Sequence, residues 1–183
     1  MHFIDTHCHL YLPVFADDLP DIFMRAAAAG VEKFYLPAID SSFINNMLTM
    51  EEKYSGRCFA MAGLHPCSVN ETYLTELKQV ESLLQKRSFA AIGEIGLDFY
   101  WSTDFTTQQY EVFDLQMQWA LQKKLPVVIH TRNAMQQTID FVKPFAAKGL
   151  SGIFHCFGGS YENAIQIIEM NFYLGIGGVL TYK

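Results

Sequence analysis

Short apolar segments alternate with longer amphipathic ones along the whole chain. The apolar segments have the length of buried strands and cover residues 3–8, 33–38, 58–64, 90–97, 126–131, 151–157 and 172–179. Between them, helix-like spacing and end signals predict helices over residues 19–29, 42–55, 70–87 and 106–124. Pro144 lies inside the next helical stretch, where a proline should kink or divide the helix.

These strands are too apolar to have one solvated face, so we expect a parallel sheet covered by helices. Seven strand–helix alternations without a linker or repeat predict a single domain over residues 1–183. Polar residues follow nearly every strand, as in a TIM (β/α)8-type barrel, whereas a doubly wound sheet gathers its ligands at one crevice. We therefore predict a barrel, here with about seven strands.

Composition narrows the class of protein further. Half of the residues are hydrophobic and the net charge is −6, which argues against a protein that coats nucleic acid with a basic surface. A metal-filled pocket can still supply positive charge locally, so a nucleic-acid enzyme stays possible. The four cysteines form no CxxC pair, and no apolar run is long enough to span a bilayer. We expect a cytoplasmic protein with free thiols and no membrane partner.

The first predicted strand ends in FIDTHCHL, with two histidines one residue apart. Because side chains alternate faces along a strand, His7 and His9 should point the same way, about 7 Å apart, with Asp5 on the same face. Buried polar groups need partners, and the rest of the chain must supply them.

Other predicted strands also end in histidines or carboxylates. A single histidine beside a strand is most often a hydrogen-bonded core residue, but such a series at corresponding strand ends favours a divalent-metal site. The residues in question, besides His7 and His9, are His65, Glu94, Asp98, His130 and His155.

The segments FIDTHCHL, GLHP, AIGEIGLDF, LPVVIHTR, GIFHCFGGS and YLGIGGVLTYK resemble, in order, the motifs of TatD-type metal-dependent deoxyribonucleases. This resemblance spans the whole chain and implies a TIM barrel of the amidohydrolase superfamily that hydrolyses DNA with divalent metal ions. It also implies that His7, His9 and Glu94 hold one ion, and that Glu94, His130 and His155 hold a second, with Glu94 bridging.

Two divalent ions, whether zinc, manganese or magnesium, can activate a water and offset charge on a phosphate. The resemblance implies that the partner is DNA, with single-stranded or frayed ends. Glu94 and His65 are the candidate catalytic residues. His65 is either a donor to the scissile phosphate or leaving group, or a turn histidine fixed by Pro66.

Three further residues have candidate supporting roles. Arg132 could bind a phosphate with both of its terminal nitrogens, or it could pair with a neighbouring carboxylate. Asp98 is expected to orient a histidine or a water, or to serve only the fold. Asp5 is expected to support the ligands rather than bind metal.

Two loops have alternative interpretations. Trp101 and Phe105 follow the fourth strand and could stack on bases, or could pack on the core. Gly158 and Gly159, before Ser160, could form a phosphate-binding turn or a plain connection to a capped helix.

The family pattern continues beyond the seventh strand, with an eighth strand whose aspartate, in a motif like ETDAP, completes the first metal site. No such motif is present in this sequence. We therefore expect either a truncated product or self-association through the unpaired edges of strands one and seven, with metal binding better retained than catalysis.

The alternative functions are an amide or ester hydrolase of the same superfamily, and an inactive metal-binding fragment. Glu94 stands where many amide hydrolases have a carboxylated lysine, which disfavours the first alternative.

Overall fold

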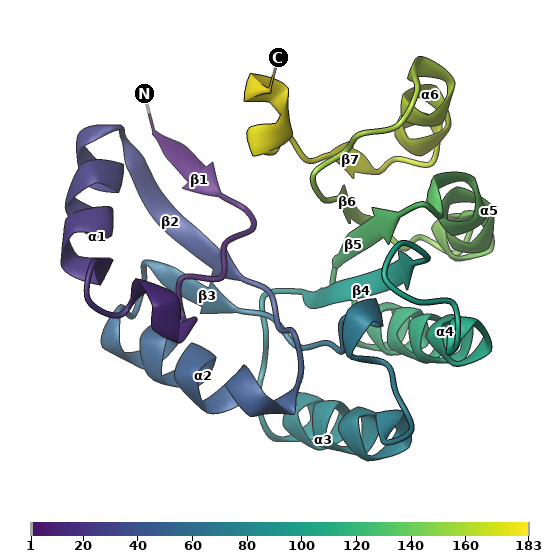
Figure 1. Ribbon diagram of the computed structural model, residues 1–183, viewed down its shortest axis with the longest axis horizontal. Helices are drawn as coiled ribbons and strands as arrows, with labels where there is room; N and C mark the ends of the chain where they lie inside the picture. Colours follow the sequence, from purple (N-terminus) through teal and green to yellow (C-terminus); the bar gives the residue numbers. More distant parts are fainter. Residues whose placement is uncertain (1, 183) are drawn as a thin grey trace.

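The computed structural model describes residues 2–182 and consists of parallel strands with helices on their outer side (Figure 1). The strands are β1 (Phe3–Asp5), β2 (Val31–Leu36), β3 (Cys58–Ala60), β4 (Ile92–Asp98), β5 (Val127–Arg132), β6 (Gly152–Phe154) and β7 (Tyr173–Leu174). The helices are α1 (Leu19–Ala28), α2 (Ile44–Lys53), α3 (Tyr73–Lys86), α4 (Thr106–Lys123), α5 (Met135–Ala146) and α6 (Tyr161–Glu169).

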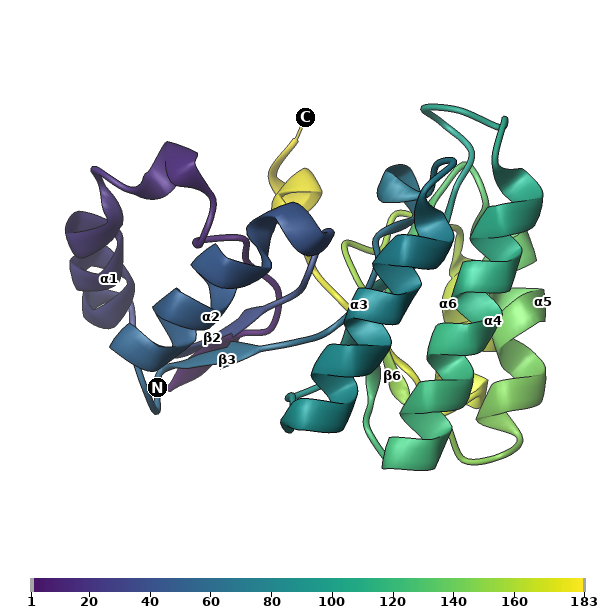
Figure 2. The same cartoon turned by 90° about the horizontal axis from the view of Figure 1, so that it is seen from below.

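The strands form two groups, in the orders β1-β2-β3 and β4-β5-β6-β7, and every pairing is parallel. A single bridge between Ala62 and Ile92 joins the two groups. Figure 2 shows α1 and α2 beside the first group and α4 to α6 beside the second. The strand order follows the chain order, as in a TIM barrel, and the prediction of a partial barrel is confirmed.

The strands differ in burial according to their neighbours. All seven residues of β4, which lies in the middle of the strand order, are buried. β1 pairs only with β2, and its Phe3 and Ile4 side chains are 49% and 51% exposed. The expectation of a buried first strand over residues 3–8 is therefore wrong, because β1 lies at an edge and ends at Asp5.

The helices agree closely with the amphipathic pattern. Pro144 is an exception to the prediction, because α5 continues through it as one helix and ends two residues later. A proline this close to the C-terminus leaves most of the helix's hydrogen bonds intact. At the other loop in question, Ser160 and Asn163 form a reciprocal capping box, so a capped strand–helix connection accounts for this turn.

Gly96 in β4 has a positive φ of 144°, and a Cβ atom at this position would lie 2.0 Å from the His130 carbonyl oxygen. Because Gly96 has no Cβ atom, β4 and β5 can approach each other closely beside Glu94 and His130. All four cysteines are free, as expected. No helix within residues 2–182 is both long and apolar enough to cross a membrane.

Candidate metal centre

Glu94 on β4 is a buried carboxylate, 3% exposed, at the centre of a cluster of imidazoles. Its Oε2 atom lies 3.0 Å from His7 Nε2 and 3.4 Å from His9 Nε2. Its Oε1 atom lies 3.1 Å from His130 Nδ1 and 3.7 Å from His65 Nε2. Burial alone would raise the pKa of Glu94, but the surrounding histidines outweigh burial and hold it well below its usual range. The carboxylate is therefore charged at neutral pH.

The ligand atoms of His7, His9 and Glu94 all lie within 4.8 Å of one another. The two Nε2 atoms are 3.2 Å apart, although β1 already ends at Asp5. Both histidines lie beyond the last residue of β1, so the prediction that His7 and His9 belong to the strand is wrong, but their rings converge. Asp5 supports this turn by accepting the His7 backbone N–H at 3.0 Å.

Tyr11 determines which nitrogen of His9 faces the cluster. Its hydroxyl donates to the Pro37 carbonyl at 2.6 Å, so its oxygen accepts the proton of His9 Nδ1 at 2.9 Å. The His9 Nε2 lone pair is then directed toward the Nε2 atom of His7, which is the arrangement that a metal-ligating histidine requires. Tyr11 is a site residue that sequence analysis missed, although its position two residues after His9 is a usable signal.

His7 differs from His9 in this respect. Its Nδ1 atom is buried without a hydrogen-bond partner among residues 2–182, so no neighbour selects its tautomer. Two imidazole nitrogens and one carboxylate oxygen that converge in a buried position match the donors preferred by zinc, and they also suit manganese. The residues present therefore fit a divalent ion held by His7, His9 and Glu94.

His130 on β5 lies between two carboxylates. Its Nδ1 atom faces Glu94, and its Nε2 atom, on the other side of the ring, lies 2.7 Å from Asp98 Oδ2. Burial would lower the pKa of His130, but these carboxylates outweigh burial and raise it. Asp98 is itself anchored, because Gln109 of α4 hydrogen-bonds both backbone polar groups of Asp98.

His155, which follows β6, stacks on His7 with ring centroids 3.3 Å apart and an interplanar angle of 11°. Burial, together with the nearby His7 ring, lowers the pKa of His155 to about 4, so the His155 ring is neutral at pH 7. Among the described residues, the ligand atoms of His155, Glu94 and His130 do not all lie within 4.8 Å of one another. The structure thus assembles the first ligand set that the resemblance implies, while the third member of the second set stacks on His7.

His65 lies at the start of the Pro66–Ser68 turn. Its Nδ1 atom accepts the Cys67 backbone N–H at 3.0 Å, so the ring proton is on Nε2, which points toward Glu94. His65 is thus both a turn histidine and a donor aimed into the cluster. Cys67 was not anticipated, but His65, Cys67 and His130 also bring ligand atoms within 4.8 Å of one another. Burial, together with Asp98, raises the pKa of the Cys67 thiol to about 12.

Arg132 does not pair with a carboxylate among residues 2–182, and its role in binding a phosphate stays a prediction. Its guanidinium carbon lies 3.6 Å from the centre of the Tyr100 ring. The arginine–carboxylate ion pairs within residues 2–182 belong to Arg25 and Arg87. The alternative of an Arg132 salt bridge is therefore wrong, and its side chain is stacked beside the site.

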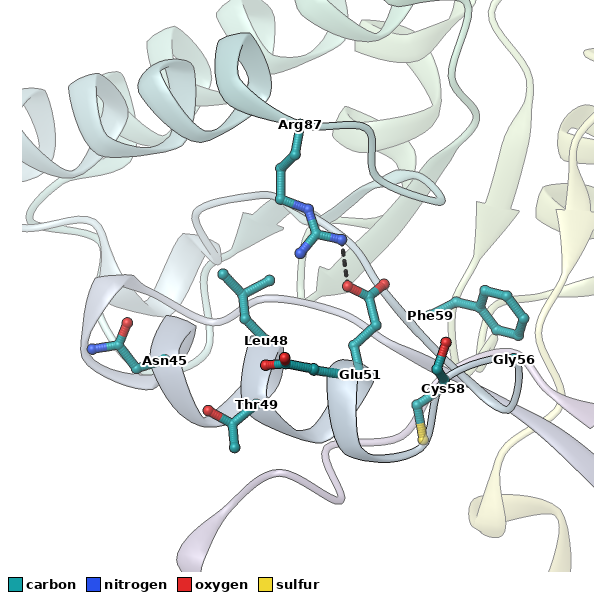
Figure 3. Close-up of a pocket in the computed structure, with 10 residues that line it drawn as sticks. Asn45, Leu48, Thr49, Glu51, Gly56, Cys58, Phe59 and Arg87 are labelled. Carbon is teal, nitrogen blue, oxygen red and sulfur yellow. Dashed lines mark hydrogen bonds and ion pairs between the residues drawn. The ribbon is translucent and has the colours of Figure 1, made fainter.

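Two cavities differ in their position relative to the cluster. One of about 320 Å³ adjoins it and is lined by Asp5, His7, His155, Cys156 and the 175–178 segment, among others. A larger cavity of about 620 Å³ lies between α2 and the start of β3 and contains the Glu51–Arg87 ion pair (Figure 3). It lies at the amino end of β3, where barrels place residues for stability rather than chemistry, and no histidine lines it.

The fold and the cluster define a parallel α/β barrel with a candidate metal centre where the strands end. A family model described as TatD related DNase matches residues 4–183, and the chain belongs to this family.

Individual relatives agree with this assignment. The chain is 35% identical over 179 residues to a protein of Bacillus subtilis named metal-dependent hydrolase YabD, covering 98% of this chain and 70% of that protein. The crystal structure of YjjV, a TatD homologue from Escherichia coli, matches with a TM-score of 0.88 and 32% identity over 98% of this chain and 70% of that one. A protein of Edwardsiella piscicida named 3'-5' ssDNA/RNA exonuclease TatD is 28% identical over 175 residues, covering 96% of this chain and 67% of that protein.

Proposed function

We propose that this protein is a cytoplasmic, divalent-metal-dependent deoxyribonuclease that cleaves phosphodiester bonds at single-stranded or frayed DNA ends. The observation that supports this best is the buried, charged Glu94 with four imidazoles around it. A second support is the family, together with the relative named as an exonuclease.

In this proposal His7, His9 and Glu94 hold one ion, and Glu94, His130 and His155 hold a second, as the resemblance implies. The ions supply positive charge for the phosphate and a water of lowered pKa. Histidine-rich ligation favours zinc or manganese, and magnesium can also serve phosphodiester hydrolysis.

The chain's own residues prepare the site in three ways. Tyr11 keeps the proton of His9 on Nδ1, so that Nε2 is free to bind. Asp98 does the corresponding task for His130 by accepting its Nε2 proton, which leaves Nδ1 toward Glu94. His65 presents an N–H on the cluster side and is placed to donate to a phosphate oxygen or to the leaving group.

The test is release of nucleotides from end-labelled single-stranded DNA by the metal-free protein after addition of Mn²⁺ or Mg²⁺. We expect metal-dependent release that is lost in Glu94→Ala, because that variant removes the carboxylate shared by all four imidazoles.

Mn²⁺ binding by calorimetry is measured on the same samples. Binding without hydrolysis of DNA would reject the nuclease proposal and select the inactive metal-binding alternative. Hydrolysis of an amide or ester substrate but not of DNA would instead select the second enzyme class.

A further inference from the structure

Three side chains at the ends of β4 and β5 form an exposed assembly, here called the aromatic platform: Tyr100, Trp101 and Arg132. The Tyr100 and Trp101 rings meet edge to face at 4.9 Å between centroids. The Arg132 guanidinium lies 3.6 Å from the Tyr100 centroid and 5.3 Å from that of Trp101. Trp101 is nevertheless 70% exposed, so most of its ring faces solvent.

The platform is connected directly to the candidate metal centre. The backbone N–H groups of Tyr100 and Trp101 both donate to Asp98 Oδ1, at 2.9 Å and 3.3 Å. The other oxygen of Asp98 accepts from His130. One carboxylate thus positions both a metal-centre histidine and the loop that carries the two aromatic rings.

The spacing along β5 places the platform one step outside the cluster. Arg132 follows His130 by two residues in the same strand, so it lies on the same face roughly 7 Å further toward the rim. Asp98 and Arg132 are register partners between β4 and β5. A linear substrate bound across the candidate metal centre would therefore contact the platform through the unit next to its reacting group.

Packing does not account for the exposed indole. Phe105, in the same loop, is partly buried against the core, as a structural aromatic should be. Trp101 instead leaves a large apolar ring in water beside a cation that has no carboxylate partner in the described chain. An exposed aromatic ring next to an unpaired arginine is the combination that single-stranded nucleic-acid sites use to bind a base and its phosphate.

We propose that the aromatic platform is a nucleobase-binding site, where the base next to the scissile phosphate of single-stranded DNA stacks on Trp101 while Arg132 faces the backbone phosphate. This inference rests on the proposed function and adds a substrate preference to it. A base inside a duplex is already stacked on its neighbours, so the platform favours single-stranded or frayed ends over intact duplex.

The chain contains two tryptophans, and Trp119 is only 7% exposed, so quenching of exposed tryptophan fluorescence reports on Trp101. The metal-free protein is titrated with a short oligothymidylate and, separately, with a base-free deoxyribose phosphate oligomer of equal length. We expect quenching by the first oligomer only. Equal quenching by both, or by neither, would overturn the proposal, because the signal would not depend on a base.

Kinetics provide the second test, with Mn²⁺ and a single-stranded oligonucleotide. Trp101→Ala should raise KM roughly 5- to 100-fold with little change in kcat, as expected for loss of one stacked base. Trp101→Phe should recover most of this loss. An oligonucleotide with an abasic site next to the cleaved bond should be insensitive to Trp101→Ala.

Tyr173→Ala serves as the matched control, because Tyr173 is 71% exposed but lies on β7, away from the platform. An unchanged KM in Trp101→Ala would reject the nucleobase site while leaving the nuclease proposal intact. Base-dependent quenching without any hydrolysis would support the site and reject the nuclease proposal.

Discussion

His130 and Asp98 form a 2.7 Å contact between imidazole Nε2 and carboxylate Oδ2, on the side of the ring opposite Glu94. This contact selects the tautomer of a candidate metal ligand. Asp98 is 2% exposed, and its pKa is lowered, because His130 and two backbone N–H groups outweigh the effect of burial. The carboxylate is thus held in its accepting form.

Removal of this acceptor should weaken metal binding. In Asp98→Ala the proton of His130 Nε2 has no partner, and we expect the Mn²⁺ affinity to fall about 10- to 100-fold. Asp98→Asn keeps an accepting oxygen and should lose less. Isothermal titration calorimetry measures both variants. Equal affinities in Asp98→Ala and the unmodified protein would show that this contact does not prepare His130.

Tyr11 should act in the same way on His9. The Tyr11→Phe variant removes the oxygen that accepts the His9 Nδ1 proton, but it keeps the aromatic ring in the core. We expect about a tenfold loss of Mn²⁺ affinity and a loss of about 1 kcal/mol in the free energy of unfolding, because the bond to Pro37 is also lost. Loss of stability with no loss of affinity would assign Tyr11 to the fold alone.

The stability of the metal-free protein should fall as the pH falls from 7 to 5. The pKa of His155 is 6.5 in the unfolded chain and about 4 in the folded one, so the unfolded chain binds more protons in this window. We expect a loss on the order of 1–2 kcal/mol in the free energy of unfolding, after allowing for the partial exposure of His155.

Two neighbouring shifts have known signs in this window. The raised pKa of His130 stabilises the fold at low pH and opposes the His155 effect as the pH approaches 7, whereas the lowered pKa of Glu94 acts in the same direction as His155, mainly below pH 4.5. Urea denaturation in the presence of EDTA measures the slope, and His155→Asn should flatten it. A slope that persists in His155→Asn would assign the proton uptake to another group.

Substitution of Gly96 should destabilise the protein, because any side chain at this position would clash with the backbone of His130. In Gly96→Ala the new Cβ atom meets the His130 carbonyl and the backbone is strained, so we expect a loss above about 2 kcal/mol. Gly56→Ala is the matched control, because Gly56 also has a positive φ but no atom lies within 4 Å of its Cβ position. That variant should lose only about 1 kcal/mol. Thermal or urea denaturation compares the two, and equal losses would exclude the steric contribution.

Self-association should be measurable at high protein concentration. Within residues 2–182, β1 pairs only with β2 and β7 only with β6, which leaves one edge of each strand unpaired. Phe3 and Ile4 are about half exposed on the β1 edge. Sedimentation velocity should show association that Ile4→Lys weakens. Leu74→Lys, at an exposed position on α3, should have no effect. A monomer at every concentration would reject this expectation.

Much of this architecture could be predicted from local patterns. The alternation of apolar and amphipathic segments was sufficient for the order of strands and helices, because each depends on side-chain periodicity within a segment. The barrel then followed from the polar residues at the strand ends, and it explains why His7, His65 and His130, far apart in sequence, all surround Glu94.

The details of the site depend on contacts between distant segments, and sequence periodicity carries no information about those. His155 stacks on His7 because β6 places it beside that ring. Arg132 contacts Tyr100 rather than a carboxylate because the loop after β4 brings the tyrosine ring against it. The chain beyond Asp5, where β1 ends, places the Nε2 atoms of His7 and His9 3.2 Å apart. The sequence thus determined which residues reach the centre of the barrel, and the tertiary structure decided which atom of each residue faces which partner, because orientation is set by packing and hydrogen bonding across the fold.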